Sequence, residues 1–413
     1  MKYCKPLFAI ILTISILFIY TFYPSNVSAE TLYSRYAALI DAESGRLLYG
    51  KNENTTAAMA STTKIMTLVT ALEICPPDMT VTVSPYAASM PDVQLNAYPG
   101  EQFRLEDLYY SLMLESHNDS AVIIAENAAY FYLCNNNDER GQIDFIEKYD
   151  NDTTFISKLT EEESMKLVSI FIGLMNIKAK NLNLTDTLFI TPNGLDAENE
   201  YGFHHTTAYE LALIMSYCIR NDDFLNITQT KSYTITDLSG GKVYQVNNKN
   251  ILLDPKSGLI SGKTGFTSKA GYCYVCAYKD DERTICIAIL GCGWPPQKNK
   301  KWSDTRFLLA LVSKYNKKAL FDGTLTFYIP VNNGKKDLCR LSSDLKYEML
   351  LCDEDKVSFT LILPEKINAP VHKSQTCGKI DIYINDEYYY SFDLFIVDDI
   401  PKKSFFYNFL KIT

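Results

Sequence analysis

The pattern of apolar and polar residues changes twice along this chain. Tyr36 to Tyr49 holds two apolar runs around a Glu43-Ser44-Gly45 turn, which predicts a pair of strands. Apolar residues then recur at helical spacing, which predicts helices over 65–74, 105–114, 120–132, 167–181, 207–220 and 302–315. Strand-like runs lie at 187–191, 259–265, 270–277 and 284–291. This order predicts an α+β fold in which helices flank an antiparallel sheet.

Turn signals separate several of these elements. Pro99-Gly100 and Asn193-Gly194 are dipeptides typical of turns. Between the predicted helices at 105–114 and 120–132 lies Glu115-Ser116-His117-Asn118-Asp119. Because asparagine and aspartate are good N-caps, we expect Asn118 or Asp119 to cap the second helix.

From about Leu320 the pattern becomes a series of short alternating runs separated by turns. They predict a smaller all-β C-terminal domain over 320–400, after a first domain over 30–318. The final segment, 401–413, has two lysines before a cluster of aromatic residues. It is either a short amphipathic tail that contacts a membrane surface or a tail packed on its own domain.

An acid-rich segment interrupts the first domain at about 134–166. Its polar composition predicts a surface insertion, with a short helix near Ile143 to Tyr149. Such an insertion either shapes a partner contact or is a solvated loop without a role.

The chain begins with the features of an export signal. Lys2 and Lys5 precede an apolar run from Leu7 to Tyr23, and Val27-Ser28-Ala29 has the small-x-small pattern of a cleavage site. We expect a signal peptide over 1–29; an uncleaved anchor is the alternative, because the apolar run is slightly long. Both place the body of the protein outside the cytoplasm.

Composition narrows the classes of ligand. The formal charge is -9 with a pI near 5.2, and no long basic run occurs, so nucleic acid is not an expected partner. The eleven cysteines are scattered without the spacing of a zinc site, and no His-Glu-x-x-His pattern is present. Most cysteines are expected to be free and buried. The sequence does not decide whether a few of them form disulfides. We expect no metal and no organic cofactor.

Candidate chemistry begins at Ser61-Thr62-Thr63-Lys64, at the start of an apolar run. Residues three apart on a helix share one face, so the hydroxyl and the amine can meet. Acyl-transfer enzymes need such a pair, a weak nucleophile beside a group that takes its proton. Alone the motif is weak, because serine is also a common N-cap.

Two further motifs follow in order, Ser116-x-Asn118 and Lys263-Thr264-Gly265. Together the three motifs resemble the serine-type D-alanyl-D-alanine carboxypeptidases, the low-molecular-mass penicillin-binding proteins of the β-lactamase and transpeptidase superfamily. The resemblance extends from about Leu32 to Tyr315, and the C-terminal β module is also similar to that family's second domain. It implies cleavage of the terminal D-alanine from peptidoglycan pentapeptide stems, with β-lactams as covalent inhibitors.

The resemblance also implies a role for each motif residue. Ser61 would be the nucleophile, Lys64 the general base and Ser116 a proton relay to the departing amine. Asn118, Lys263, Thr264 and Gly265 would bind the substrate, and the backbone N–H groups of Ser61 and Phe266 would form the oxyanion hole. A general-base lysine must be neutral, and burial beside Lys263 favours that form. Gly262 and Gly265 are expected to leave room for a substrate strand beside the sheet edge.

Two alternatives remain at this stage, along with one departure from the family pattern. A serine β-lactamase would need a further carboxylate to activate water, and none is evident before the Lys263 motif. A non-catalytic cell-wall-binding homologue would not require intact motifs. His117 stands where the family usually has glycine; its imidazole either narrows the cleft or points to solvent.

Overall fold

The computed structural model describes residues 32–136, 154–254 and 256–403. Its centre is a five-stranded antiparallel sheet with the order β2-β1-β11-β10-β9. The strands are β1 (Tyr36–Asp41), β2 (Leu47–Lys51), β9 (Leu259–Thr267), β10 (Gly271–Lys279) and β11 (Thr284–Leu290). The predicted signal peptide, the proposed helix near 143–149 and most of the tail lie outside the described residues.

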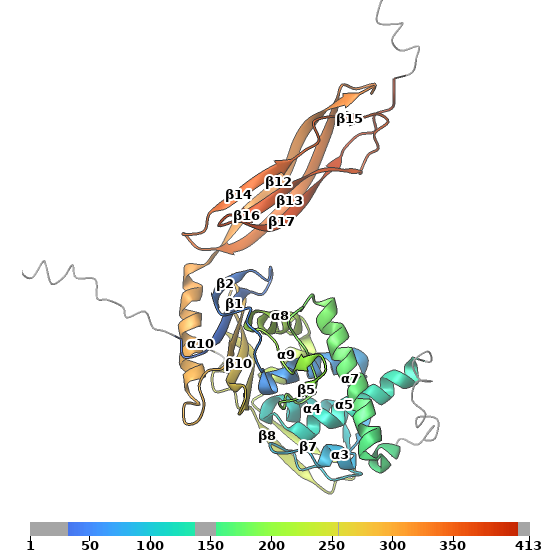
Figure 1. The fold of residues 1–413 in the computed structure, drawn as a ribbon, viewed down its shortest axis with the longest axis vertical. Coiled ribbons are helices and arrows are strands. Elements are labelled where there is room, and N and C mark those ends of the chain that lie inside the picture. Colours follow the sequence, from blue (N-terminus) through green and yellow to red (C-terminus); the bar gives the residue numbers. More distant parts are fainter. Residues whose placement is uncertain (1–31, 137–153, 255, 404–413) are drawn as a thin grey trace, which may run out of the picture.

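Helices cover both faces of this sheet, which explains why its strands are apolar almost throughout (Figure 1). Alternate residues of β11 belong to two separate cores: Cys286 and Ala288 lie in the larger one, Ile285 and Ile287 in the smaller one. The smaller core is closed by Trp302 and Leu308 of α10 (Lys300–Leu311). Helix α8 (Ala208–Cys218) packs on the opposite face.

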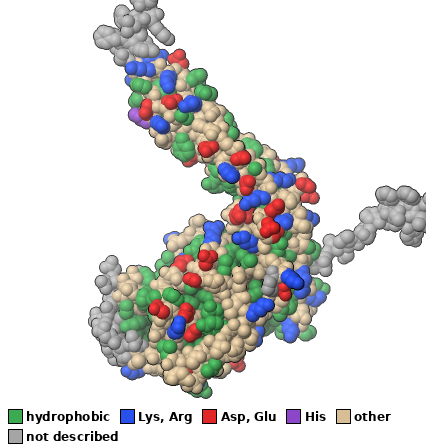
Figure 2. Space-filling view, turned by 180° about the vertical axis from the view of Figure 1, so that it is seen from behind, with side chains coloured by type: hydrophobic (Ala, Val, Ile, Leu, Met, Phe, Trp, Pro, Cys, Tyr) green, Lys and Arg blue, Asp and Glu red, His purple; other side chains and the backbone are tan. Residues whose placement is uncertain are grey.

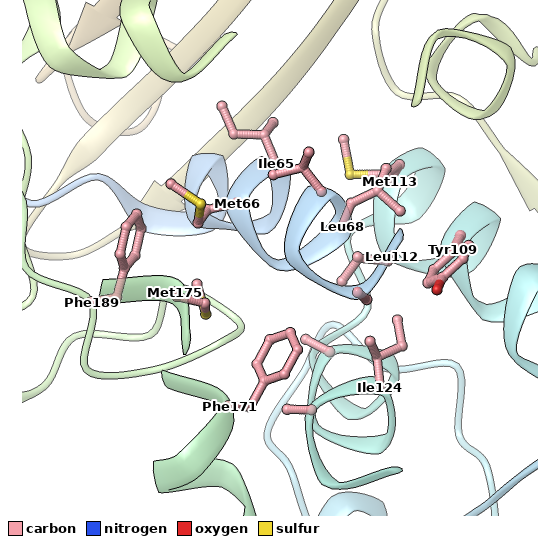
Figure 3. Close-up of a cluster of buried hydrophobic side chains, with 14 of the residues drawn as sticks. Ile65, Met66, Leu68, Tyr109, Leu112, Met113, Ile124, Phe171, Met175 and Phe189 are labelled. Carbon is pink, nitrogen blue, oxygen red and sulfur yellow. The ribbon is translucent and has the colours of Figure 1, made fainter. Parts of the chain in front are cut away.

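Helix α2 (Lys64–Ile74) lies at the centre of the larger core (Figure 3). It is preceded by the 3₁₀ turn η1 (Ala60–Thr63), so that Ser61 and Lys64 lie at the junction of the two elements. Residues 64–71 of α2 are all buried, including the polar Lys64, Thr67 and Thr70, because other elements pack around the helix on every side. Its neighbours in this core include Met113, Ile124 and Phe171, which come from three different elements.

The first part also contains further helices, strands and turns. They are β3 (Thr80–Thr82), α3 (Pro85–Ala88), β4 (Gln102–Arg104), α4 (Leu105–Tyr110), the π-helical turn η2 (Ser111–Glu115), α5 (Asn118–Asn135), η4 (Phe155–Lys158), α7 (Glu161–Asn181), β5 (Glu198–Asn199), β6 (Gly202–Phe203), α9 (Asp222–Gln229), β7 (Ser232–Thr236), β8 (Val243–Asn247) and η5 (Val312–Lys314). Helix α9 was not predicted from the sequence.

The C-terminal part is a six-stranded sheet with the order β14-β16-β17-β13-β12-β15, as the alternating runs predict. Its strands are β12 (Asn316–Asn332), β13 (Leu338–Leu351), β14 (Val357–Ile362), β15 (Ile367–Asn368), β16 (Thr376–Ile384) and β17 (Glu387–Ile396). It has an apolar core of its own. The module extends away from the first part, and charged side chains of both signs are scattered over its surface (Figures 1 and 2).

The predicted strand at 187–191 is wrong. Only an isolated bridge joins Leu188 to His205. Two side chains provide the hydrogen-bond partners that a neighbouring strand would otherwise provide to this backbone. Asn176 bonds both the N–H and the carbonyl of Phe189, and the His204 ring accepts from Ile190 N–H.

The polar segment at 134–166 is shorter than predicted. Helix α5 continues to Asn135, and α7 begins at Glu161 rather than at 167. The three glutamates at 161–163 form the first turn of α7, where they oppose the positive end of the helix dipole. Thr160 and Glu163 complete a capping box.

The cysteines and the membrane-spanning potential of the helices can be examined over the described residues. All ten described cysteines are free, and seven of them are buried, which confirms the expectation for most of them. Within the described ranges, no helix combines the length and the apolar character that a membrane crossing requires.

Candidate active site

Ser61 lies in the η1 turn, between α2 and the edge strand β9. The turn packs so closely on its neighbours that two glycines are required there. A Cβ on Gly194 would lie 2.1 Å from the Ala60 carbonyl oxygen, and one on Gly265 would lie 2.8 Å from the Ser61 nitrogen. Three segments far apart in sequence therefore meet at the Ser61 backbone.

The Lys64 side chain reaches back to Ser61 within one helical turn, as predicted. Its Nζ lies 3.0 Å from Ser61 Oγ, 2.9 Å from Asn118 Oδ1 and 2.5 Å from the Asn193 carbonyl oxygen. Lys64 is completely buried, and this burial lowers the pKa of its amine well below the ordinary value. The nearby Lys263 lowers this pKa further, while Asp119 opposes the shift.

The three neighbours of Lys64 Nζ fix the orientation of its N–H groups and its lone pair when the amine is neutral. The Asn118 amide nitrogen donates to the Pro91 and Asp92 carbonyls, so its oxygen faces Lys64. That oxygen and the Asn193 carbonyl can only accept, and a neutral amine has two N–H groups to donate. The remaining lone pair then faces Ser61 Oγ. This arrangement can remove the proton of the serine hydroxyl.

Ser116 ends the π-helical turn in a left-handed backbone conformation, with φ of 72°. Its hydroxyl is buried and has no hydrogen-bond partner among the described residues. The structure therefore does not connect Ser116 to the Ser61, Lys64 and Asn118 cluster by a hydrogen bond. Its predicted relay role stays a prediction.

The predicted cap of α5 is wrong. The N-cap residue is His117, without a side-chain cap, and Asn118 is already the first helical residue. The Asn118 and Asp119 side chains are used elsewhere, because Asp119 accepts from the backbone N–H groups of Leu95 and Asn96. Both residues thus hold the 91–97 loop beside Lys64.

His117 does not point to solvent, and that alternative is wrong. Its side chain is buried, with Nδ1 at 2.8 Å from Ser111 Oγ and Nε2 at 3.7 Å from a Glu115 carboxylate oxygen. Burial lowers the pKa of the ring, against the attraction of Asp119 and Glu115. The imidazole therefore stabilises the π-helical turn from the protein interior.

Lys263, Thr264 and Gly265 lie on β9, the edge strand of the sheet, as predicted. Lys263 is buried, its Nζ donates to the Thr264 carbonyl at 2.8 Å, and burial lowers its pKa to about 7. Phe266 follows on the same strand with its ring 4.7 Å from that of Tyr272. A cation at an open strand edge suits a ligand carboxylate.

The two glycines of β9 are required by the packing of the protein itself, and their role in leaving room for a substrate strand stays a prediction. Gly265 makes room for the Ser61 backbone, as described above. A Cβ on Gly262 would lie 2.6 Å from the Asn250 amide nitrogen and 2.7 Å from the Tyr274 hydroxyl. Both glycines therefore accommodate the protein's own atoms.

Sequence reasoning missed three contributors to the site. The Asn193 carbonyl, the Asp119 carboxylate and the His204 ring all hold the cluster together. Asn193 was recognised only as part of a turn, because residue type carries no information about a backbone carbonyl. Among the described residues, no group of His, Cys, Asp and Glu side chains is arranged to hold a metal ion.

Two family models match the chain. The first, described as D-alanyl-D-alanine carboxypeptidase, matches residues 24–130 and 168–293. The second, described as the C-terminal domain of penicillin-binding protein 5, matches residues 316–402. The gap in the first match, 131–167, contains the whole acid-rich segment.

Curated proteins and solved structures match over most of the chain. D-alanyl-D-alanine carboxypeptidase DacF of Bacillus subtilis is 27% identical over 92% of this chain and 89% of its own length. DacD of Escherichia coli, of the same description, is 25% identical over 93% and 91%. Penicillin-binding protein 5 from Haemophilus influenzae has a TM-score of 0.67 at 20% identity, covering 91% of this chain and all of that one. The last likeness concerns the fold.

Proposed function

Because the chain belongs to the D-alanyl-D-alanine carboxypeptidase family, we propose that Ser61 removes the terminal D-alanine of peptidoglycan pentapeptide stems through an acyl-enzyme. The observation that carries this assignment is the Lys64 amine. It lies 3.0 Å from the Ser61 hydroxyl, while two carbonyl acceptors occupy its other hydrogen-bonding positions. This geometry activates a hydroxyl without a histidine.

Acylation would proceed as follows. Lys64 accepts the Ser61 proton while Oγ attacks the carbonyl carbon of the penultimate D-alanine. The C–N bond then breaks, the proton passes to the amine of the terminal D-alanine, and an ester on Ser61 remains. Water hydrolyses that ester and restores Ser61. The backbone N–H groups of Ser61 and Phe266 would stabilise the oxyanion, each typically by about 3 kcal/mol.

Lys263 would bind the carboxylate of the terminal D-alanine, with Thr264 beside it. The pKa of about 7 leaves Lys263 partly neutral in the free enzyme. An arriving carboxylate favours the charged form of the amine, so binding of substrate would raise this pKa. A β-lactam carries a similar carboxylate and would acylate Ser61 as a covalent inhibitor.

The reaction would take place outside the cytoplasmic membrane, where the substrate occurs. The export signal expected over 1–29 supports this location. The two lysines and the aromatic cluster of 401–413 support a contact with a membrane surface.

The test is release of D-alanine from a muropeptide pentapeptide by the purified protein, with Ser61→Ala as the control. We expect release by the wild type, none by the variant, and labelling of only the wild type by a fluorescent penicillin. Neither release nor labelling by the wild type would favour the binding homologue. Rapid turnover of penicillin in place of a long-lived adduct would favour a β-lactamase.

A further inference from the structure

His204 packs against the η1 turn that carries Ser61, and it belongs to none of the three motifs. Its ring is buried between the η1 turn and the loop at 190–195, and it packs edge-on against Phe189. Its two nitrogens contact two different segments. Nδ1 lies 2.9 Å from the Ile190 nitrogen and 3.4 Å from that of Thr191, and Nε2 lies 2.7 Å from Thr63 Oγ1.

These contacts define the tautomer of the ring. Backbone N–H groups can only donate, so Nδ1 is the acceptor and the proton is on Nε2. Nε2–H donates to Thr63 Oγ1, whose own proton goes to the Ala60 carbonyl at 2.8 Å. Burial lowers the pKa of His204 to about 3, so the ring keeps this neutral form at working pH.

His204 thus joins the η1 turn to the loop at 190–195, and Lys64 can act as a base only if these two segments keep their relative position. Thr63 lies in the turn that carries Ser61, between the nucleophile and the base. The loop held by Nδ1 carries the Asn193 carbonyl, which takes one N–H of Lys64. A second link joins the same loop to α2, from Thr67 Oγ1 to the Pro192 carbonyl at 2.6 Å.

We propose that His204 is a positioning residue, which fixes the distance between the Ser61 turn and the Asn193 carbonyl and so aims the Lys64 lone pair at Ser61. The proposal rests on the function assigned above. If the loop moves away, Lys64 loses one acceptor and can rotate an N–H toward Ser61 Oγ. A displacement of about 1 Å can lower a rate about 100-fold.

The first test is His204→Ala, assayed for the acylation rate constant with a fluorescent penicillin and for kcat and KM of D-alanine release. We expect acylation and kcat to fall about 10- to 100-fold with KM changed less than about threefold. We also expect the acid limb of the pH profile to move to higher pH, because water reaching Lys64 raises its pKa. His204→Gln should restore most of the rate, since its amide also presents an acceptor and a donor.

A milder variant keeps the proposal testable if His204→Ala does not fold. Thr63→Val removes the acceptor of Nε2–H at nearly constant volume, whereas Thr63→Ser keeps the hydroxyl. We expect Thr63→Val to lower acylation and Thr63→Ser to retain it. His205→Gln is the matched control, because among the described residues the His205 ring contacts only Phe203, whose carbonyl it hydrogen-bonds and whose ring it packs against.

The outcomes separate the two proposals. A wild-type protein that is not acylated would refute the proposed function itself. The positioning role alone would be overturned by a different result. In that case the wild type is active, and His204→Ala and Thr63→Val lose thermal stability but keep the wild-type rates and pH profiles.

Discussion

The two parts of this molecule differ in the polar groups that they bury. The catalytic part buries Lys64, Lys263, Asp119 and Glu126. Among the described residues of the β module, 316–403, Asp381 is the only polar or charged residue that is buried. Burial of a charged group opposes folding unless it is paired, so the first part maintains its site at the expense of stability. The module has almost no such cost.

This difference indicates different roles. Lys64 and Lys263 both have lowered pKa values because they are buried, and both lie at the proposed site. Perturbed ionisable groups are typical of functional sites. The apolar core of the module indicates a structural role, with charged pairs such as Lys318 and Asp353 on its surface.

The largest effect is expected for Lys64→Met, which should abolish the lone pair without changing the volume greatly. The acylation rate constant should fall about 1,000-fold, as for loss of a general base. Since the folded pKa lies below the unfolded value of 10.5, wild-type Lys64 opposes folding at low pH, and this cost disappears as pH rises to 10.5. Urea unfolding at several pH values should show that the variant lacks this slope.

Lys180→Met, at an exposed position near the end of α7, is the control for Lys64→Met and should change neither property. A Lys64→Met protein that still reacts with penicillin at the wild-type rate would show that another group activates Ser61.

The second effect concerns the charge of Lys263. With a pKa near 7, its amine loses the proton above neutral pH, so kcat/KM for the pentapeptide should fall about tenfold for each pH unit above about 7. Lys263→Arg stays charged and should move this limb to higher pH. Lys279→Arg, at the exposed end of β10, should leave the profile unchanged. A wild-type profile that stays flat to pH 9 would contradict the assignment.

A third effect should appear in stability alone. Glu126 is fully buried in α5, accepts from Ser84 Oγ at 2.9 Å, and has a pKa raised by burial to about 8. The folded state therefore holds a proton that the unfolded state loses above 4.5, so stability falls with pH between 4.5 and about 8. The slope approaches about 1.4 kcal/mol per pH unit.

Glu126→Gln removes this ionisation, and its difference in unfolding free energy from the wild type should grow across that window. The exposed Glu162→Gln serves as its control. A constant difference between pH 5 and 9 would show that Glu126 is ionised throughout.

Much of the sheet and of the chemistry could be predicted because they depend on residue type and spacing. The alternating runs predicted the module, and the three-residue spacing predicted the contact between Ser61 and Lys64. The strand at 187–191 failed because its apolar sequence cannot reveal that Asn176 and His204 satisfy its backbone.

Other features of the site arise only from packing. A backbone carbonyl such as that of Asn193 has no signature in the sequence. The role of Gly265 depends on how near the Ser61 turn lies, and the inward direction of His117 depends on Ser111 in the preceding π-helical turn.

The smallest effect should come from the joint between the two parts. Arg46, in the turn before β2, donates to the Leu350 carbonyl and pairs with Asp355 at 2.5 Å. Asp355 also accepts from Asn385. Asp355→Ala leaves the Arg46 charge unpaired and should lower the unfolding free energy by about 2 kcal/mol. Differential scanning calorimetry should detect a lower or divided transition.

The same variant tests whether the β module has only a structural role. If the module is structural, Asp355→Ala should release D-alanine at the wild-type rate at 25 °C despite its lower stability. Asp353→Ala removes an exposed carboxylate from the same turn and should change neither property, since exposed pairs contribute about 0–1 kcal/mol. A fall in kcat for Asp355→Ala alone would mean that the joint acts on the Ser61 cluster. The route would run through β1 and β2, because Arg46 lies between these strands of the central sheet.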